Sequence, residues 1–287
     1  LPLPLPIFLT LAITSVPKAK LSLILKGVDI VSTLLSMASV YKRRKEYHEV
    51  VSMYEQARDV RLLLNSDNKD QEMIESLLAL AYEKNKDLEK ALSCYQHVLK
   101  LRKLMFGEMS LQVGNIYASL SNLHRRMDDH AQSLGWNKRA ITIYTKLYED
   151  SKTENPNGKG QNYNVQRHLI GSLQNQGGLY VQMNEIERSI STYLMVVEHQ
   201  VNFLGEDHHD VARTLNVLGD LYMAKKSYSE ARASFNRVLK LYKRYGVGDD
   251  DPDMVSTIQC LCEIEGIICK EGKKVSPRST QKKQHKK

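Results

Sequence analysis

One spacing of apolar, small and aromatic residues recurs five times along this chain of 287 residues and constrains its fold more than any other feature. The clearest copy fills eight slots, with Leu215, Leu218, Gly219, Tyr222, Tyr228, Ala231, Phe235 and Val238. The fourth slot, which we name the anchor, holds Tyr41, Tyr82, His124, Tyr180 and Tyr222, at intervals of 41, 42, 56 and 42 residues. A fixed period of roughly 20–50 residues indicates stacked structural units rather than one globular core.

Each copy predicts a pair of helices. The apolar slots lie three or four residues apart, which places them on one face of each helix. A small residue in the first helix (Ala38, Ala79, Ser121, Gly177, Gly219) is expected to face a compact residue in the second (Val50, Ala91, Ser133, Ser189, Ala231). Since such a pair cannot bury its apolar faces alone, the pattern predicts an all-α, right-handed α-solenoid of helix-turn-helix repeats.

The stretch from Leu204 to Tyr222, LGEDHHDVARTLNVLGDLY, carries a family resemblance. It resembles the tetratricopeptide repeat motif Leu-Gly-x-x-His-Pro-x-Val-Ala-x-x-Leu-x-x-Leu-Gly-x-x-Tyr, in the 42-residue variant of kinesin light chains and nephrocystin-type proteins. His209 stands where the motif has proline. The resemblance implies a protein–protein interaction scaffold, with kinesin heavy chain or cargo as candidate partners.

The chain divides into three predicted parts. Residues 1–20 are expected to be an unstructured end, residues 21–272 the solenoid of about five repeats plus a capping helix, and residues 273–287 a basic disordered tail. The long interval between anchors predicts a loop insertion at residues 150–164, which contains Asn155-Pro156-Asn157-Gly158. The capping helix is expected from Asp253 to Lys270, with Ile258, Leu261, Ile264 and Ile268 on its apolar face.

The net charge of +8 belongs mainly to the tail. Eight basic residues and one acidic residue follow from Lys270 onward, which leaves 33 basic and 32 acidic residues before it. A basic tail without interleaved aromatic residues argues against base stacking, so nucleic-acid binding is disfavoured. The four cysteines are too few for a disulfide framework in a chain of this length. The apolar N-terminus is too short to span a bilayer.

No motif predicts catalysis, a cofactor or a metal. Gly158-Lys159-Gly160 lacks the spacing of a phosphate-binding loop. His208, His209 and Asp210 lie in a turn between repeats, where an acidic residue that caps the next helix is the simpler interpretation. Cys260 and Cys262 lack the spacing of a zinc site. We therefore expect a protein that is not an enzyme.

The concave groove of the solenoid is the candidate binding site. Positions of the first helices that face this groove hold amides, which can bond an extended peptide backbone, and basic side chains, which attract acidic peptides. The candidate peptide-binding residues are Lys42, Arg43, Lys84, Asn122, Arg125, Arg126, Asn175, Gln182 and Asn216. The alternative is that the basic side chains only solvate helix ends, with Glu46, Glu83, Asp128 and Asp129 cancelling part of their charge.

The sequence thus predicts a non-catalytic, cytoplasmic scaffold that binds partner peptides, of the kind of a kinesin-light-chain cargo adaptor and associated with the cytoskeleton. The alternative function is an organelle or ciliary assembly factor, for which a mitochondrial location stays open. A nucleic-acid binder acting through the tail is a further, weaker alternative. No small-molecule substrate and no membrane span are expected.

Overall fold

The computed structural model describes residues 30–63, 68–154, 161–248 and 250–275, and the side chains within 152–154, 161–162 and 268–275 lie outside this description. The described residues form helices and no β-strand. They belong to two compact units, divided between Pro156 and Asn157. The predicted N-terminal end at 1–20 and most of the predicted tail lie outside the described residues.

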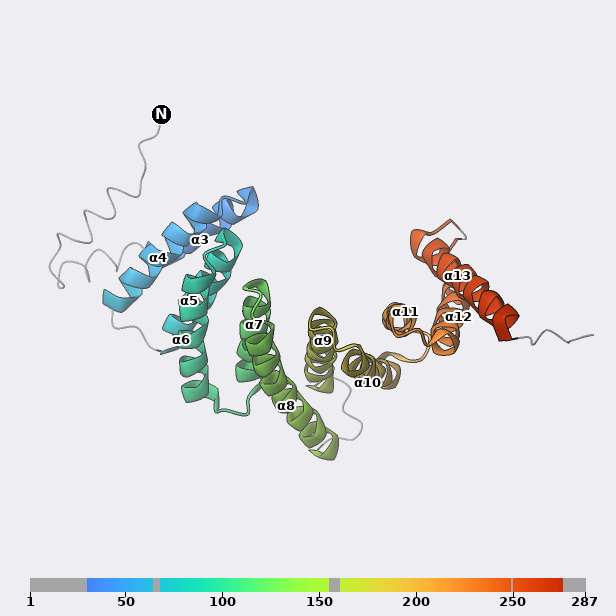
Figure 1. Cartoon of the computed structure of the whole chain (residues 1–287). Coiled ribbons are helices and arrows are strands. Elements are labelled where there is room, and N and C mark those ends of the chain that lie inside the picture. Colours follow the sequence, from blue (N-terminus) through green and yellow to red (C-terminus); the bar gives the residue numbers. More distant parts are fainter. Residues whose placement is uncertain (1–29, 64–67, 155–160, 249, 276–287) are drawn as a thin grey trace, which may run out of the picture. The chain divides into compact units, whose positions relative to one another are not determined.

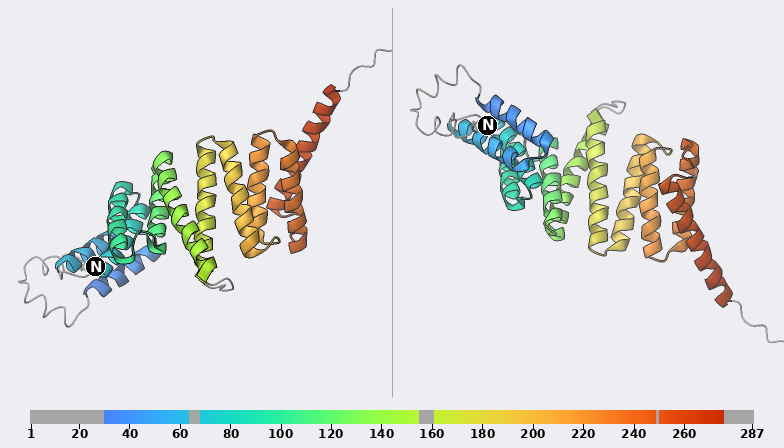
Figure 2. Two further views of the ribbon diagram at one scale, coloured as in Figure 1. Left: turned by 90° about the horizontal axis from the view of Figure 1, so that it is seen from below. Right: turned by 90° about the horizontal axis from the view of Figure 1, so that it is seen from above.

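The first unit contains three helix pairs (Figure 1). They are α3 (Ile30–Arg44) with α4 (Tyr47–Leu63), α5 (Asn68–Asn85) with α6 (Leu88–Phe106), and α7 (Leu111–Arg126) with α8 (His130–Glu154). The second unit contains α9 (Gln161–Gln182) with α10 (Ile186–Leu204), α11 (His209–Ala224) with α12 (Tyr228–Tyr245), and α13 (Pro252–Val275). In Figure 2 the helices α9 to α12 lie side by side in chain order. The predicted all-α solenoid of helix pairs is confirmed.

The two helices of every pair are joined by the same tight turn. The residue four positions after the anchor has a positive φ, although it is never glycine: Lys45, Lys86, Asp128, Asn184 and Lys226. The next residue donates its N–H to the anchor carbonyl at 2.8–3.1 Å in all five turns. This is the hydrogen bond of a Schellman motif, which satisfies the last carbonyls of the first helix. The turn therefore fixes the start of each second helix.

Small residues let the paired helices approach closely. The Ser133 hydroxyl donates to the Ser121 carbonyl at 2.8 Å, and the Ser189 hydroxyl donates to the Gly177 carbonyl at 3.0 Å. These bonds satisfy buried hydroxyls that would otherwise cost free energy. The predicted facing of small residues is confirmed at these two pairs.

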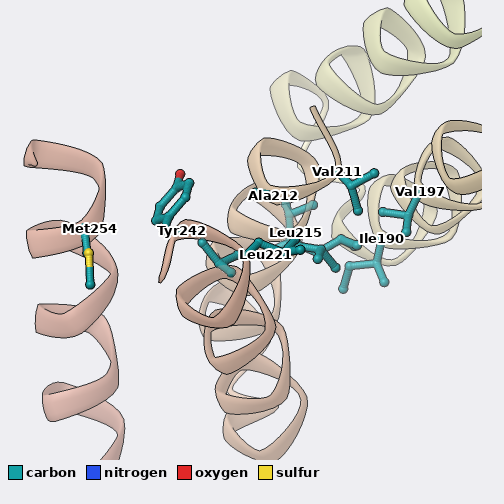
Figure 3. Packing of buried hydrophobic residues seen from close by; sticks show 11 residues of the cluster. Ile190, Val197, Val211, Ala212, Leu215, Leu221, Tyr242 and Met254 are labelled. Atoms are coloured by element: carbon teal, nitrogen blue, oxygen red, sulfur yellow. The ribbon is translucent and has the colours of Figure 1, made fainter. Parts of the chain in front are cut away.

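The apolar core runs between consecutive pairs. In the second unit Ile190 and Val197 of α10 meet Val211 and Leu215 of α11, and the cluster continues through Tyr242 and Met254 (Figure 3). This continuity from one pair to the next is how stacked repeats bury faces that a single pair leaves open.

Two predicted boundaries are wrong. The segment 150–164 is not a loop throughout, because α8 continues to Glu154 and α9 begins at Gln161. Only residues 155–160, which hold the proline and glycines, fall outside the described helices. The capping helix also runs past the predicted end of the solenoid at residue 272, to Val275.

The apolar face of α13 differs from the predicted one. Ile264 is fully buried against the cluster of Ala231 and Phe235, but Ile258 is 39% exposed. Met254 and Thr257 are buried instead. Positions 254, 257, 261 and 264 form one stripe at spacings of three and four, and Ile258 lies beside that stripe. Ile268 lies outside the described side chains.

Candidate peptide-binding surface

Basic side chains recur in the last turn of the first helices of the first unit. Lys42 and Arg43 end α3, Lys84 lies near the end of α5, and Arg125 and Arg126 end α7. All five are exposed. A cation is favourable near a helix C-terminus because it opposes the negative end of the helix dipole. Because the helix dipole alone accounts for basic residues at these positions, the residues do not by themselves indicate a binding site. The contacts that each side chain makes decide whether it is available to a ligand.

Arg126 is bound inside the protein. Its guanidinium donates to a carboxylate oxygen of Glu83 and, at 3.0 Å, to the main-chain carbonyl of Glu83. The other carboxylate oxygen of Glu83 accepts the Tyr95 hydroxyl at 3.0 Å. Burial, reinforced by the charge of Glu83, raises the pKa of Tyr95 well above its usual range. Arg126 therefore joins the ends of α5 and α7, and part of its donor capacity is already used within the protein. Its role in binding a peptide stays a prediction.

The other four cations have no such partner. Lys42, Arg43, Lys84 and Arg125 make no side-chain hydrogen bond or ion pair with any residue that the structure describes. We name these four residues the basic row. Because Arg126 holds the ends of α5 and α7 together, Lys84 and Arg125 belong to neighbouring helix ends. Asn122 lies one turn before Arg125 and is also exposed.

The predicted amides of the second unit are less accessible. The Asn216 amide donates to the Tyr242 hydroxyl at 3.2 Å, and its carbonyl oxygen accepts the Thr257 hydroxyl at 3.2 Å. Asn216 therefore joins α11 to α12 and α13, and its role as a peptide ligand stays a prediction. Asn175 is half-buried and already engaged within the protein. Gln182, the last residue of α9, is exposed.

The turn before α11 also differs from the prediction. The residue that caps the helix is His208, whose Nδ1 accepts the N–H of Asp210 at 3.2 Å, and not an acidic side chain. Among the described residues, no group of three or more His, Cys, Asp or Glu is placed to hold a metal ion.

The sequence did not predict a cavity of about 400 Å³ in the second unit, between α9, α10 and the start of α11. Its lining includes Arg167, Arg213, Tyr163 and Phe203, none of which occupies one of the groove positions taken from the repeat. No helix in the described part of the chain is long and apolar enough to cross a bilayer.

The repeat pattern has a direct counterpart among known families. Residues 70–146 and 169–244 match one profile described as "Tetratricopeptide repeat", and residues 33–66 match a second profile with the same description. The first profile alone covers more than half of the chain. The chain is a tetratricopeptide repeat protein. This repeat is a protein–protein interaction scaffold, whose stacked units present extended binding surfaces.

Solved structures of other proteins share the fold. BtubC (BKLC) from P. vanneervenii is 18% identical, with a TM-score of 0.59 over 82% of this chain and 90% of that chain. The nearly identical TPR-like repeats of a kinesin light chain from Podosopora anserina are 13% identical, with a TM-score of 0.59 over 75% and 96%. Acl4, an assembly chaperone of RpL4, is 16% identical, with a TM-score of 0.51 over 86% and 91%.

At such identities these likenesses show the fold alone. Among curated protein sequences, none matches the chain.

Proposed function

We propose that this tetratricopeptide repeat protein is a non-catalytic adaptor that binds acidic segments of partner proteins at the basic row. The observation that carries the proposal is a difference among the cations of the first unit. Arg126 is neutralised by Glu83, whereas Lys42, Arg43, Lys84 and Arg125 are exposed and unpaired among the described residues. Solvent-exposed cations at equivalent positions of successive repeats attract an extended acidic chain and raise its rate of association.

The mechanism that we propose is electrostatic capture followed by hydrogen bonding. Carboxylates of the partner would pair with the ammonium and guanidinium groups of the basic row. The Asn122 amide would then bond the partner's backbone, since an amide offers both donors and an acceptor. Because exposed ion pairs contribute only about 0–1 kcal/mol each, several must act together to hold one peptide.

Two cellular roles fit such an adaptor. We favour a cytoplasmic cargo adaptor of the kinesin-light-chain kind, which is supported by the likeness in fold to kinesin-light-chain repeats and to BtubC. The alternative is an assembly factor of an organelle or cilium, and the likeness to an assembly chaperone supports that class. A coprecipitated motor subunit would favour the first role, and a coprecipitated assembly intermediate would favour the second.

The test is binding of the purified chain to peptides of graded acidity, measured by fluorescence anisotropy at two salt concentrations. We compare the wild-type chain with Lys84→Glu/Arg125→Glu and with the control Lys100→Glu/Lys146→Glu, which reverses two exposed charges on second helices. Reversal in the basic row is expected to weaken binding of the most acidic peptide at least tenfold, whereas the control changes it little. High salt is expected to weaken the wild-type complex by screening.

A truncated chain that ends at Val275 lacks residues 276–287. Its affinity distinguishes peptide binding at the basic row from peptide binding at the tail. If the basic-row variant binds normally and the truncated chain does not, the site is the tail, and the proposed function of the basic row is wrong.

A further inference from the structure

The cavity of the second unit is chemically unlike the basic row. It has a volume of about 400 Å³ and lies between the N-terminal half of α9, the C-terminal end of α10 and the first turn of α11. This volume falls in the range of roughly 300–1,000 Å³ typical of ligand pockets. Such pockets combine an apolar wall with a few polar groups that orient the ligand.

Two guanidinium groups line this cavity. Arg167 of α9 and Arg213 of α11 are both exposed, and neither donates a side-chain hydrogen bond or forms an ion pair within the described part of the chain. Burial, together with the positive charge of Arg167, lowers the pKa of the neighbouring His168. Arginine presents planar donors that match a carboxylate or phosphate in a bidentate manner. The free donors therefore favour an anion.

The remaining charge in the cavity limits what that anion can be. The Asp210 carboxylate also lines the cavity, 3.6 Å from Nδ1 of His208. The two guanidinium groups and the one carboxylate together leave a single net positive charge. A singly charged carboxylate matches this balance better than a phosphate group, which carries about −1.5 to −2 at neutral pH.

The apolar wall is built from an aromatic pair. The ring centroids of Tyr163 and Phe203 lie 5.0 Å apart with an interplanar angle of 53°. Ile170 and Leu204 extend this wall. A large apolar or aromatic side chain of a ligand can pack on such rings, and aromatic pairs prefer offset or tilted contacts of this kind.

Gly171 leaves room for the ligand. A Cβ built on Gly171 would meet no atom within 4 Å, and Gly171 is one of the residues that line the cavity. At the innermost position Gln200 is only 1% exposed, and its side-chain oxygen accepts the Thr214 hydroxyl at 2.8 Å. The cavity is therefore preformed, with polar groups at its end already satisfied.

We infer that this cavity, which we name the α9–α11 pocket, is a second peptide subsite that takes an acidic residue with a large apolar or aromatic neighbour. Arg167 and Arg213 clamp the carboxylate, and the apolar side chain packs on Tyr163 and Phe203 beside Gly171. The inference rests on the proposed function for the class of ligand, a partner peptide, but it concerns different residues in the other unit.

The experiment uses the full chain and fluorescein-labelled peptides in a Gly/Ser frame. Each probe carries one Phe and one Asp, with zero to two residues between them. Matched peptides replace Asp by Asn, Phe by Ala, or Asp by phosphoserine. The protein variants are Arg213→Gln, Gly171→Leu, which fills the pocket, and the control Gly135→Leu. Gly135, in α8 of the first unit, is likewise an exposed helical glycine, and a Cβ on it would meet no atom within 4 Å.

Filling the pocket or neutralising Arg213 is expected to weaken binding of the best Phe/Asp peptide at least tenfold, and Gly135→Leu leaves it unchanged. The Asn and Ala peptides are expected to bind at least tenfold more weakly. Wild-type affinity in Gly171→Leu, equal affinity for the Asn peptide, or tighter binding of the phosphoserine peptide would each overturn the inference.

Failure of this inference can be told apart from failure of the proposed function. The same probes are measured with Lys84→Glu/Arg125→Glu. Loss in that variant alone supports the basic row and removes the α9–α11 pocket as a subsite. Loss in Gly171→Leu alone supports the pocket and leaves the basic row without a role in binding this probe.

Discussion

Gly219 of α11 lies so close to Phe235 of α12 that a Cβ on the glycine would be 2.4 Å from Cε1 of the ring. Phe235 is 1% exposed, so its ring has no free space into which to turn. The closeness of this helix pair therefore depends on the absence of a side chain at residue 219.

Gly219→Ala is expected to destabilise the second unit by about 1–3 kcal/mol, because overpacking a filled core forces side chains or backbone to shift. The change in helix propensity acts in the opposite direction, since alanine is favoured over glycine in a helix by about 1 kcal/mol. The measurement is urea unfolding followed by circular dichroism.

Gly171→Ala is the matched control for this prediction. It makes the same exchange in α9, where the new methyl group meets nothing within 4 Å. We expect this variant to be as stable as the wild type or more stable by up to about 1 kcal/mol. Equal changes in the free energy of unfolding for the two substitutions would show that the contact with Phe235 does not determine how a side chain at residue 219 affects stability.

Lys86→Gly is expected to stabilise the first unit by about 0.5–1 kcal/mol, because it relieves the left-handed backbone conformation of a residue with a Cβ. Lys86 has a φ of 70° in the turn between α5 and α6, and a residue with a Cβ is strained there whereas glycine is not. Lys86 is exposed, so its side chain contributes little packing. Thermal unfolding is the measurement, and the midpoint should rise.

Lys100→Gly provides the contrast, because Lys100 is an exposed residue inside α6. Glycine in a helix interior is unfavourable by about 1 kcal/mol, so this midpoint should fall. A fall in both variants would mean that the left-handed turn does not strain Lys86.

The helix pairs could be predicted because each repeat carries its own apolar stripe and its own compact facing residues. The hydrogen bonds from Ser133 to Ser121 and from Ser189 to Gly177 join residues that the spacing alone predicts to face each other. The left-handed turns could not be predicted in the same way. Glycine or asparagine at these positions would indicate a positive φ, but lysine occupies three of the five.

The free and paired cations could not be separated by sequence. Arg126 and Glu83 are 43 residues apart, and their pairing depends on how two repeats pack. Arg125, the neighbouring residue, has the same chemistry and points to no partner among the described residues. The α9–α11 pocket was missed for a related reason. Arg167 and Arg213 lie on first helices but outside the positions taken from the repeat, and Phe203 belongs to a second helix, so only the packing of three helices brings them to one cavity.

Arg126→Gln and Arg125→Gln are expected to separate stability from binding. Arg126→Gln removes the ion pair and weakens the bond to the Glu83 carbonyl, so the first unit should lose about 0.5–1 kcal/mol, a small value because the pair is partly exposed. Arg125→Gln should leave stability unchanged and weaken binding of acidic peptides. Urea unfolding and anisotropy on both variants give the comparison, which a loss of stability in Arg125→Gln would contradict.

Cys94 predicts how stability depends on alkaline pH. Burial, reinforced by the charge and hydrogen bond of Glu75, raises the pKa of this thiol from 9.0 to about 12. The folded chain therefore keeps the proton at a pH where the unfolded chain loses it. The stabilisation is complete below pH 9.0 and is lost progressively as the pH rises toward about 12, by at most about 1.4 kcal/mol per pH unit.

Cys94→Ala isolates this contribution. The packing cost of the substitution does not vary with pH. Tyr82 and Tyr95 interact electrostatically with Cys94, but burial and neighbouring carboxylates raise the pKa of each well above its usual range, so both stay protonated in the folded chain over the pH range of the measurement. Urea unfolding between pH 8 and pH 10.5, under reducing conditions, should show the wild-type free energy of unfolding falling more steeply above pH 9 than that of the variant. Parallel pH profiles would show that ionisation of Cys94 is not linked to folding.

The exposed Cys262 should react with a thiol reagent in the folded chain at neutral pH, and Cys94 should react only after unfolding.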